Sequence, residues 1–204
     1  MKLKEERIGV EFTNSYGEQM VIIEYVNAHK VQVMFLDEHK WTTWTDTSNL
    51  KRGSVISPFT KTIHGVGYLG TDETGSRLTT TGENARAYTT WSHMMERCYS
   101  GKYPTYSDVT VCDRWHSFSQ FLEDLPKIQN YEYWLEHENE RVSLNKDIYY
   151  TENQLEHKNK VYSLETCRFI TSSESSKETR ARDKRTRQAT IEEEIRKLRE
   201  LRGQ

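Results

Sequence analysis

Hydrophobic and polar residues alternate in the first sixty positions, whereas further along the chain apolar residues recur every three or four positions. The alternating part contains three β-rich runs, at Met20 to Tyr25, Val31 to Phe35 and Lys40 to Thr45, separated by short polar turns. Such runs predict a small antiparallel meander. With an extended start at Ile8 to Phe12 and a last segment at Val55-Ile56, five strands could close into a barrel.

Two amphipathic helices are predicted in the middle of the chain. Apolar side chains recur at spacings of three and four from Tyr88 to Cys98, and again from Trp115 to Leu125, where Pro126 ends the pattern. Both apolar stripes need a common partner. The strand pair expected between residues 142 and 171 is the one that the sequence offers.

That later segment predicts the order strand, loop, strand, helix. Residues 142–148 carry Val, Leu and Ile on one face of an extended run, and residues 167–171 alternate in a second run. Residues 151–160 hold a single large apolar side chain and are expected to cross the surface. Residues 172–175, SSES, offer hydroxyl caps and a first-turn carboxylate for a helix start.

The C-terminal helix is expected to be basic at first and amphipathic afterwards. An apolar seam at Ile191, Ile195, Leu198 and Leu201 predicts a partner protein or a homodimer. The basic stretch predicts contacts to the phosphates of a nucleic acid. Its six basic residues are Lys177, Arg180, Arg182, Lys184, Arg185 and Arg187.

Five short motifs occur in order along residues 88 to 180. They are Trp91–Tyr99 (WSHMMERCY), Pro104–Tyr106 (PTY), Val111–Phe121 (VCDRWHSFSQF), Leu144–Asp147 (LNKD) and Tyr162–Ile170 (YSLETCRFI). With them the chain resembles the HNH-type (ββα-metal) nuclease family, and more closely a group of phage-encoded HNH-like proteins. The resemblance implies a ββα domain whose helix meets double-stranded DNA in a bacterial host cell, with Arg168 among the contacts.

The chain departs from that family where an active enzyme would do its chemistry. By resemblance, Asn145 stands at the position of the metal-holding Asp, and Lys146 at that of the general-base His. An amide is a poorer Mg²⁺ ligand than a carboxylate, and a lysine at its ordinary pKa of about 10.4 cannot accept a proton at neutral pH. Asp147 and Glu165 complete this degenerate site, so the resemblance favours a scaffold without activity. Burial that lowers the lysine pKa would leave cleavage open.

The first module carries a second resemblance. Glycines, a Pro and apolar residues from Gly9 to Pro58 match the pattern of an SH3-like module found in phage and Gram-positive proteins. The expected fold is therefore α+β. Its parts are an SH3-like β module at residues 1–60, a linker at 61–87, an HNH-like ββα domain at 88–188 and a C-terminal amphipathic helix at 189–204.

The composition of the chain limits how it can bind nucleic acid and in which cellular compartment it is expected. The chain has 204 residues, 34% of them hydrophobic, and a net charge of −2, so any nucleic-acid binding must use a local patch. Its mean hydropathy of −0.90 and the lack of a long apolar run predict no membrane span. The three cysteines, Cys98, Cys112 and Cys167, form no C-x-x-C pair. Met1 to Lys4 are not expected to begin a signal peptide. A reducing cytoplasm is therefore expected, with no metal ligands assigned.

Three functions remain open from the sequence. The first is a phage-type nucleic-acid-binding protein on a degenerate HNH scaffold. The second is an active homing or nicking endonuclease that uses Mg²⁺, with Asp147, Glu165, His137 or His157 in place of the missing groups. The third is an interaction protein that binds or inhibits a host complex through the N-terminal module and the C-terminal seam. Only the second would need a cofactor.

Overall fold

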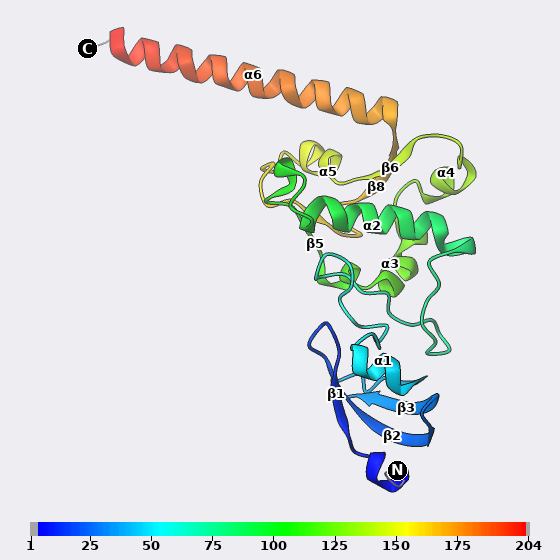
Figure 1. Cartoon of the computed structure of the whole chain (residues 1–204). Coiled ribbons are helices and arrows are strands. Elements are labelled where there is room, and N and C mark those ends of the chain that lie inside the picture. The colour runs from blue at the N-terminus through cyan, green and yellow to red at the C-terminus, as the bar shows by residue number, and fades with distance from the viewer. Residues whose placement is uncertain (1–3, 203–204) are drawn as a thin grey trace. The chain divides into compact units, whose positions relative to one another are not determined.

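The computed structural model describes residues 4–202. Residues 1–3 and 203–204 lie outside the described residues, and with them the predicted opening of the first module and the last two positions of the C-terminal helix. The protein combines α and β structure, with a four-stranded antiparallel sheet near the N-terminus and a long C-terminal helix (Figure 1). Both features were predicted and are confirmed.

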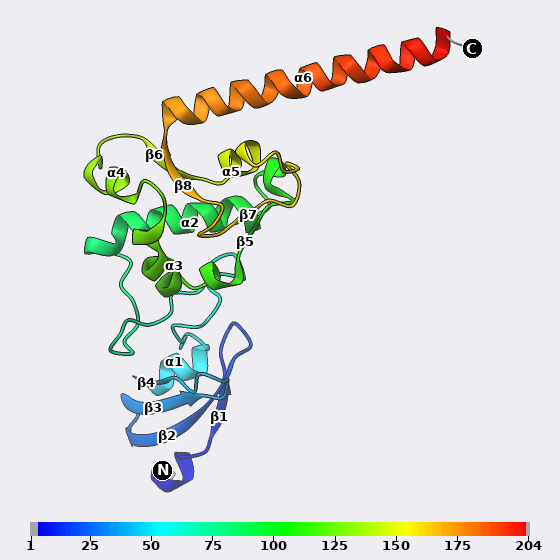
Figure 2. The ribbon, with the colours of Figure 1, turned by 180° about the vertical axis from the view of Figure 1, so that it is seen from behind.

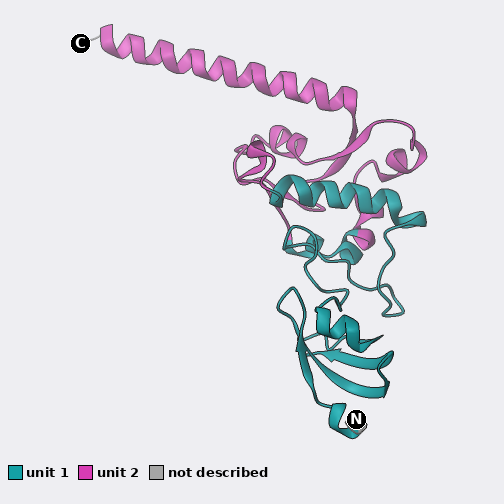
Figure 3. Cartoon of the chain, viewed as in Figure 1, with its two compact units in different colours: residues 1–100, 113–121 teal, residues 101–112, 122–204 magenta. Residues whose placement is uncertain are grey.

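The chain divides into two compact units that interleave along the sequence (Figure 3). Unit 1 comprises residues 1–100 and 113–121, and unit 2 comprises residues 101–112 and 122–204. Short 3-10 helices occur in both. They are η1 (Lys4–Arg7), η2 (Gly82–Asn84), η3 (Pro104–Tyr106), η4 (Asp113–His116) and η5 (Leu125–Lys127).

The sheet at the start of unit 1 follows the predicted meander. Its strands pair in sequence order, each antiparallel to the next. Because side chains alternate between faces, Met20 and Ile22 share a buried face with Val31, Val33 and Phe35. The strands are β1 (Glu11–Thr13), β2 (Gln19–Asn27), β3 (Lys30–Phe35) and β4 (Thr42–Thr45).

The predicted fifth strand is not formed, so the described strands make an open sheet and not the expected closed barrel. Val55 is buried in the sheet core, but it joins no strand ladder. A short helix, α1 (Thr47–Arg52), precedes it and was missed. Asp46 caps this helix by accepting a hydrogen bond from the backbone N–H of Asn49, and left-handed Gly53 ends it.

The rest of unit 1 packs around an aromatic cluster. Helix α2 (Ala85–Tyr99) was predicted from Tyr88 to Cys98, and it begins three residues earlier. The indole of Trp91 donates to the backbone oxygen of Trp115 at 2.7 Å, and its ring lies 5.3 Å from that of Phe118. The predicted second helix is shorter than expected, because its residues divide among η4, α3 (Phe118–Asp124) and η5.

The predicted linker at residues 61–87 is bound into unit 1. The backbone N–H of Tyr68 donates to the oxygen of His116, and the N–H of Phe118 donates back to the oxygen of Tyr68. Gly70 has a φ of 73°, and a Cβ placed there would lie 2.3 Å from the hydroxyl of Ser119. This close approach requires a glycine.

Unit 2 contains two short strand pairs and the long helix (Figures 1 and 2). Strand β6 is antiparallel to β8, and β5 is parallel to β7. The strands are β5 (Thr110–Val111), β6 (Val142–Asn145), β7 (Val161–Tyr162) and β8 (Arg168–Thr171). The helices are α4 (Tyr131–Glu136), α5 (Asp147–Glu152) and α6 (Ser172–Arg202).

Several local expectations for unit 2 need correction. Ile148 does not continue the first strand, because β6 ends at Asn145 and α5 begins two residues later. Phe169 and Ile170 are both buried, so the second strand does not alternate as expected. The cap of α6 is Thr171, one residue before the predicted serines. Its backbone N–H donates to Glu174, and its hydroxyl accepts from the Glu174 N–H.

Candidate functional site: the Lys146 cluster and the basic face of helix α6

The position expected to hold a metal-binding Asp is used to start a helix. Asn145 is the last residue of β6, opposite Arg168 of β8. Its side-chain oxygen accepts a hydrogen bond from the backbone N–H of Ile148 at 3.1 Å. This is the usual way in which an Asn satisfies an orphan amide at a helix N-terminus. The amide oxygen of Asn145 therefore serves the fold of α5.

Lys146 lies in the interior of unit 2 with 2% of its surface exposed. Its ammonium nitrogen is 3.3 Å from a carboxylate oxygen of Asp147. It also lies 4.8 Å from the ring centre of Tyr106 and 4.7 Å from that of Tyr162. A carboxylate and two aromatic faces all attract a cation. The surroundings of this side chain therefore suit a charged ammonium.

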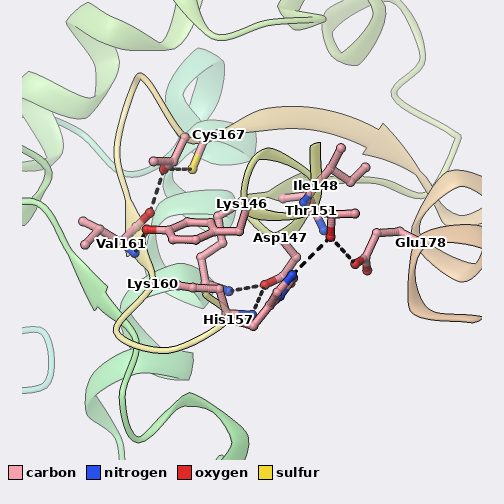
Figure 4. A network of polar contacts seen from close by, with 12 residues as sticks. Lys146, Asp147, Ile148, Thr151, His157, Lys160, Val161, Cys167 and Glu178 are labelled. Atoms are coloured by element: carbon pink, nitrogen blue, oxygen red, sulfur yellow. Dashed lines mark hydrogen bonds and ion pairs between the residues drawn. The ribbon is translucent and has the colours of Figure 1, made fainter. Parts of the chain in front are cut away.

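Asp147 joins two lysines (Figure 4). Its Oδ1 atom accepts from the Nζ atom of Lys146 and from that of Lys160, which is 2.5 Å away. Burial alone would raise the pKa of Asp147, but the two positive charges and their hydrogen bonds outweigh it, and the pKa is lowered. The carboxylate is therefore ionised at neutral pH and engaged on both sides.

A second polar chain connects α5, the following loop and α6. The hydroxyl of Thr151 donates to Glu178 at 3.2 Å and lies 3.3 Å from Nε2 of His157 (Figure 4). Burial, and then the charges of Lys160 and Arg182, lower the pKa of His157, so its ring is neutral at pH 7. Because the single hydroxyl proton of Thr151 goes to Glu178, Nε2 of His157 carries the ring proton in this arrangement.

The remaining candidates for metal binding do not gather at this cluster. Glu165 is exposed, and a hydrogen bond with Ser163 lowers its pKa. His137 ends α4, where its ring stacks on Tyr133 at 3.9 Å. Within residues 4–202, no three His, Cys, Asp or Glu side chains are placed to hold a metal ion. The carboxylate of Asp147, which could hold Mg²⁺, already accepts hydrogen bonds from two ammonium groups.

The predicted nucleic-acid contacts divide into two groups. Two arginines are engaged: Arg168 pairs with Glu152 at 2.6 Å, and Arg182 pairs with Glu178 at 3.5 Å. The others are exposed, and within the described part of the chain their side chains form no ion pair or hydrogen bond. This second group consists of Lys177, Arg180, Lys184, Arg185 and Arg187.

Four of those exposed cations follow one line along α6. Residues 177, 180, 184 and 187 recur at spacings of three and four, so at about 100° per residue they fall within a sector of about 80°. Glu178, Arg182 and Arg185 fall on the opposite side. That side carries the bonds to Thr151 and borders a cleft with His157. We call Lys177, Arg180, Lys184 and Arg187 the basic stripe.

Several residues of the cluster were not predicted as site residues. Tyr106 and Tyr162 belong to two of the five motifs, but nothing in those motifs places them beside Lys146. Lys160 is thirteen residues from Asp147, and the loop that brings it back carries no periodic pattern. In unit 1, Trp44 is exposed, with the ammonium of Lys30 5.1 Å from its ring centre, while Trp41 packs on the core.

No helix among residues 4–202 combines the length and the apolar character needed to cross a membrane. The chain was compared with protein-family models, with curated proteins and with solved structures, and none of the three comparisons gave a match. The likeness of residues 88–180 to HNH-type nucleases therefore rests on the five sequence motifs.

Proposed function

We propose that this protein binds double-stranded DNA through the basic stripe of α6 and does not cleave it, on a degenerate HNH-like ββα scaffold. The observation that carries the proposal is the stripe itself. Four cations are exposed along one face of a helix that starts directly after the β6–β8 pair, and none is neutralised by an ion pair within the described residues. Such a face suits the regular charge of a phosphate backbone.

Local charge matters here because the whole chain is slightly acidic. Residues 177–187 contain six basic and two acidic side chains, whereas residues 188–202 contain four of each. The positive field is therefore concentrated in one half of α6. The side of the helix opposite to the stripe is engaged by Thr151 and the α5 loop, so the stripe is the side left open to a ligand.

The surroundings of Lys146 support binding without cleavage. A general base must have a lone pair and must reach the water that it activates. The Lys146 nitrogen instead faces the Asp147 carboxylate and two tyrosine rings and is buried. The Asp147 carboxylate, which a divalent ion would need, already accepts from two ammonium groups.

The proposal is tested by titrating a labelled DNA duplex with the protein at several salt concentrations. If the four stripe residues each contact a phosphate, log K should fall against log salt with a slope of about −3.6. Replacing Lys177, Arg180, Lys184 and Arg187 together by Gln should abolish most of this slope. A charge-matched control replaces Lys30, Lys40, Lys51 and Arg52, which are exposed in unit 1, and should bind as the wild type does.

Two results would overturn the proposal. One is the lack of binding to duplex DNA at low salt, which would favour the interaction protein instead. The other is equal binding by the stripe variant and the control. Cleavage is checked separately with supercoiled plasmid and Mg²⁺ or Mn²⁺, where we expect intact plasmid. Relaxation that disappears in Asp147→Ala or His157→Ala would establish the endonuclease alternative.

A further inference from the structure

The second half of α6 exposes an apolar seam. No residue of this helix is buried, and Leu198 and Leu201 expose 60% and 71% of their surface. Ile191 and Ile195 expose 41% and 42% of their surface. In Figures 1 and 2 this half of α6 extends beyond the other elements of unit 2. A contiguous row of exposed aliphatic side chains is typical of a site of interaction with another surface.

The charges beside the seam identify a second copy of the same helix as the cover. With Ile191, Ile195 and Leu198 at the core positions d, a and d of a heptad pattern, each flanking g residue is opposite in charge to the e residue five positions later. They are Arg187 (g), Glu192 (e), Glu194 (g) and Arg199 (e). In a parallel pair, each g residue faces the e residue five positions later on the partner helix. Arg187 would thus meet Glu192, and Glu194 would meet Arg199.

The apolar residues favour the parallel orientation. In a parallel pair each core residue meets its own copy, so Ile191, Ile195 and Leu198 form three apolar layers. The antiparallel register that satisfies the same charges would place Leu198 against Gln188. Arg187, Glu194 and Arg199 form no ion pair within residues 4–202, so they are available for contacts between helices.

We propose that the protein forms a homodimer through a parallel coiled coil of residues 187–202. The basic stripe lies on the same side of α6 as this seam, because residues 177–187 continue its spacing of three and four. With Arg187 paired to Glu192, the other three stripe residues of the two copies, Lys177, Arg180 and Lys184, would then face each other across the dimer. Like charges repel, so the basic halves diverge, and a polyanion that enters between them relieves the repulsion.

The binding of a polyanion between the two basic halves rests on the proposed function, whereas dimerisation through the seam does not. DNA binding and dimerisation should therefore promote each other, since each lowers the cost of the other. The arrangement is the one in which continuous helices fork from a zipper around a duplex. The seam has only three apolar layers, so the dimer should be weak and concentration-dependent without DNA.

The experiment is sedimentation equilibrium of the full chain without nucleic acid, at about 0.15 M and about 0.5 M salt. We expect the apparent mass to rise from 24.2 kDa toward twice that value as the protein concentration increases. Ile195→Lys should remain a monomer over the same range. Thr190→Lys adds the same charge to the same helix outside the seam, and it should dimerise like the wild type.

A charge swap tests the orientation. Glu194→Arg should weaken the dimer, and Glu194→Arg with Arg199→Glu should restore it, because parallel pairing then places the introduced arginine against the introduced glutamate of the other copy. Antiparallel pairing would instead bring Arg187 against the introduced arginine, and the double variant would stay weak. Circular dichroism checks that each variant keeps its helix content.

The inference is overturned if the wild type sediments as a monomer at all concentrations, if Ile195→Lys and Thr190→Lys behave alike, or if the charge swap fails to restore the dimer. Loss of DNA binding with an intact dimer would contradict only the proposed function. DNA binding by a protein that is always monomeric would contradict only the coiled coil.

Discussion

Replacing the carboxylate of Asp147 should destabilise unit 2 far more than replacing either of its lysine partners. At 3.3 Å and an effective dielectric constant of about 20, the Lys146–Asp147 charges attract by about 5 kcal/mol, before the cost of their burial. Asp147→Asn would remove the carboxylate that two largely buried ammonium groups share, so we expect the free energy of unfolding to fall by about 3–5 kcal/mol. Lys146→Met keeps the Asp147–Lys160 pair and a side chain of similar length, so a change of about 1 kcal/mol is expected.

Hydrogen exchange of peptides from residues 142–171, followed against urea concentration, measures this difference in unit 2 alone. Asp183→Asn is the control, because Asp183 is exposed in α6 and should change stability by less than about 0.5 kcal/mol. Since the folded pKa of Asp147 is lowered, its contribution is complete above the unfolded pKa of about 3.9 and is lost as the pH falls through the folded value. Asp147→Asn should lack this acid-dependent loss. Equal effects of Asp147→Asn and Lys146→Met would refute the reasoning.

Three further outcomes follow from contacts elsewhere in unit 2. Glu174→Ala breaks the capping box of α6 and should cost about 1 kcal/mol, seen as faster amide exchange in the first turn of the helix and unchanged exchange in α5. Burial raises the pKa of Cys167 to about 12, so iodoacetamide at pH 8 should leave Cys167 unmodified in the folded protein and label it in urea, as mass spectrometry would detect. Because burial and two nearby cations lower the pKa of His157, its contribution to stability is complete above about pH 6.5 and is lost below it. His157→Gln should flatten the stability profile below about pH 6.5, and an unchanged profile would contradict this.

The sequence predicted the regular parts of the fold because they depend on local periodicity. The alternation in β2 and β3 and the spacing of three and four in α2 each reflect one buried face, which a short window reveals. The prediction of a fifth strand is wrong, because Val55 is buried but pairs with no neighbouring strand. Burial alone produces the same apolar pair in a strand and in an extended loop. Helix α1 has one buried residue, Leu50, which is too few for a visible period.

The candidate site was predictable only as far as neighbours in sequence determine it. That a lysine stands at residue 146, where the resemblance would expect a histidine, can be read directly from the sequence. Which groups surround its ammonium depends on Tyr106 and on the segment that returns at Lys160 and Tyr162, and these two segments are separated from residue 146 in the sequence. Periodicity within a short stretch of sequence does not predict contacts between segments that are far apart in the chain. The alignment of the basic stripe on one face of α6 is easier to predict, because it follows from the helical repeat alone.

If the proposed HNH-like scaffold is correct, the two ammonium groups around Asp147 explain how it keeps its shape without nuclease chemistry. A divalent ion in an HNH-type site both neutralises carboxylates and lowers the pKa of a bound water. Lys146 and Lys160 provide the first effect, since they hold the Asp147 carboxylate between β6 and the loop before β7. They cannot provide the second, because an ammonium has no open coordination position for water. Reversing this outcome would require the removal of both lysines, because either one alone still occupies the carboxylate. A single Lys146→His substitution should therefore not create a nuclease, although it supplies the imidazole that the proposed scaffold would need at this position.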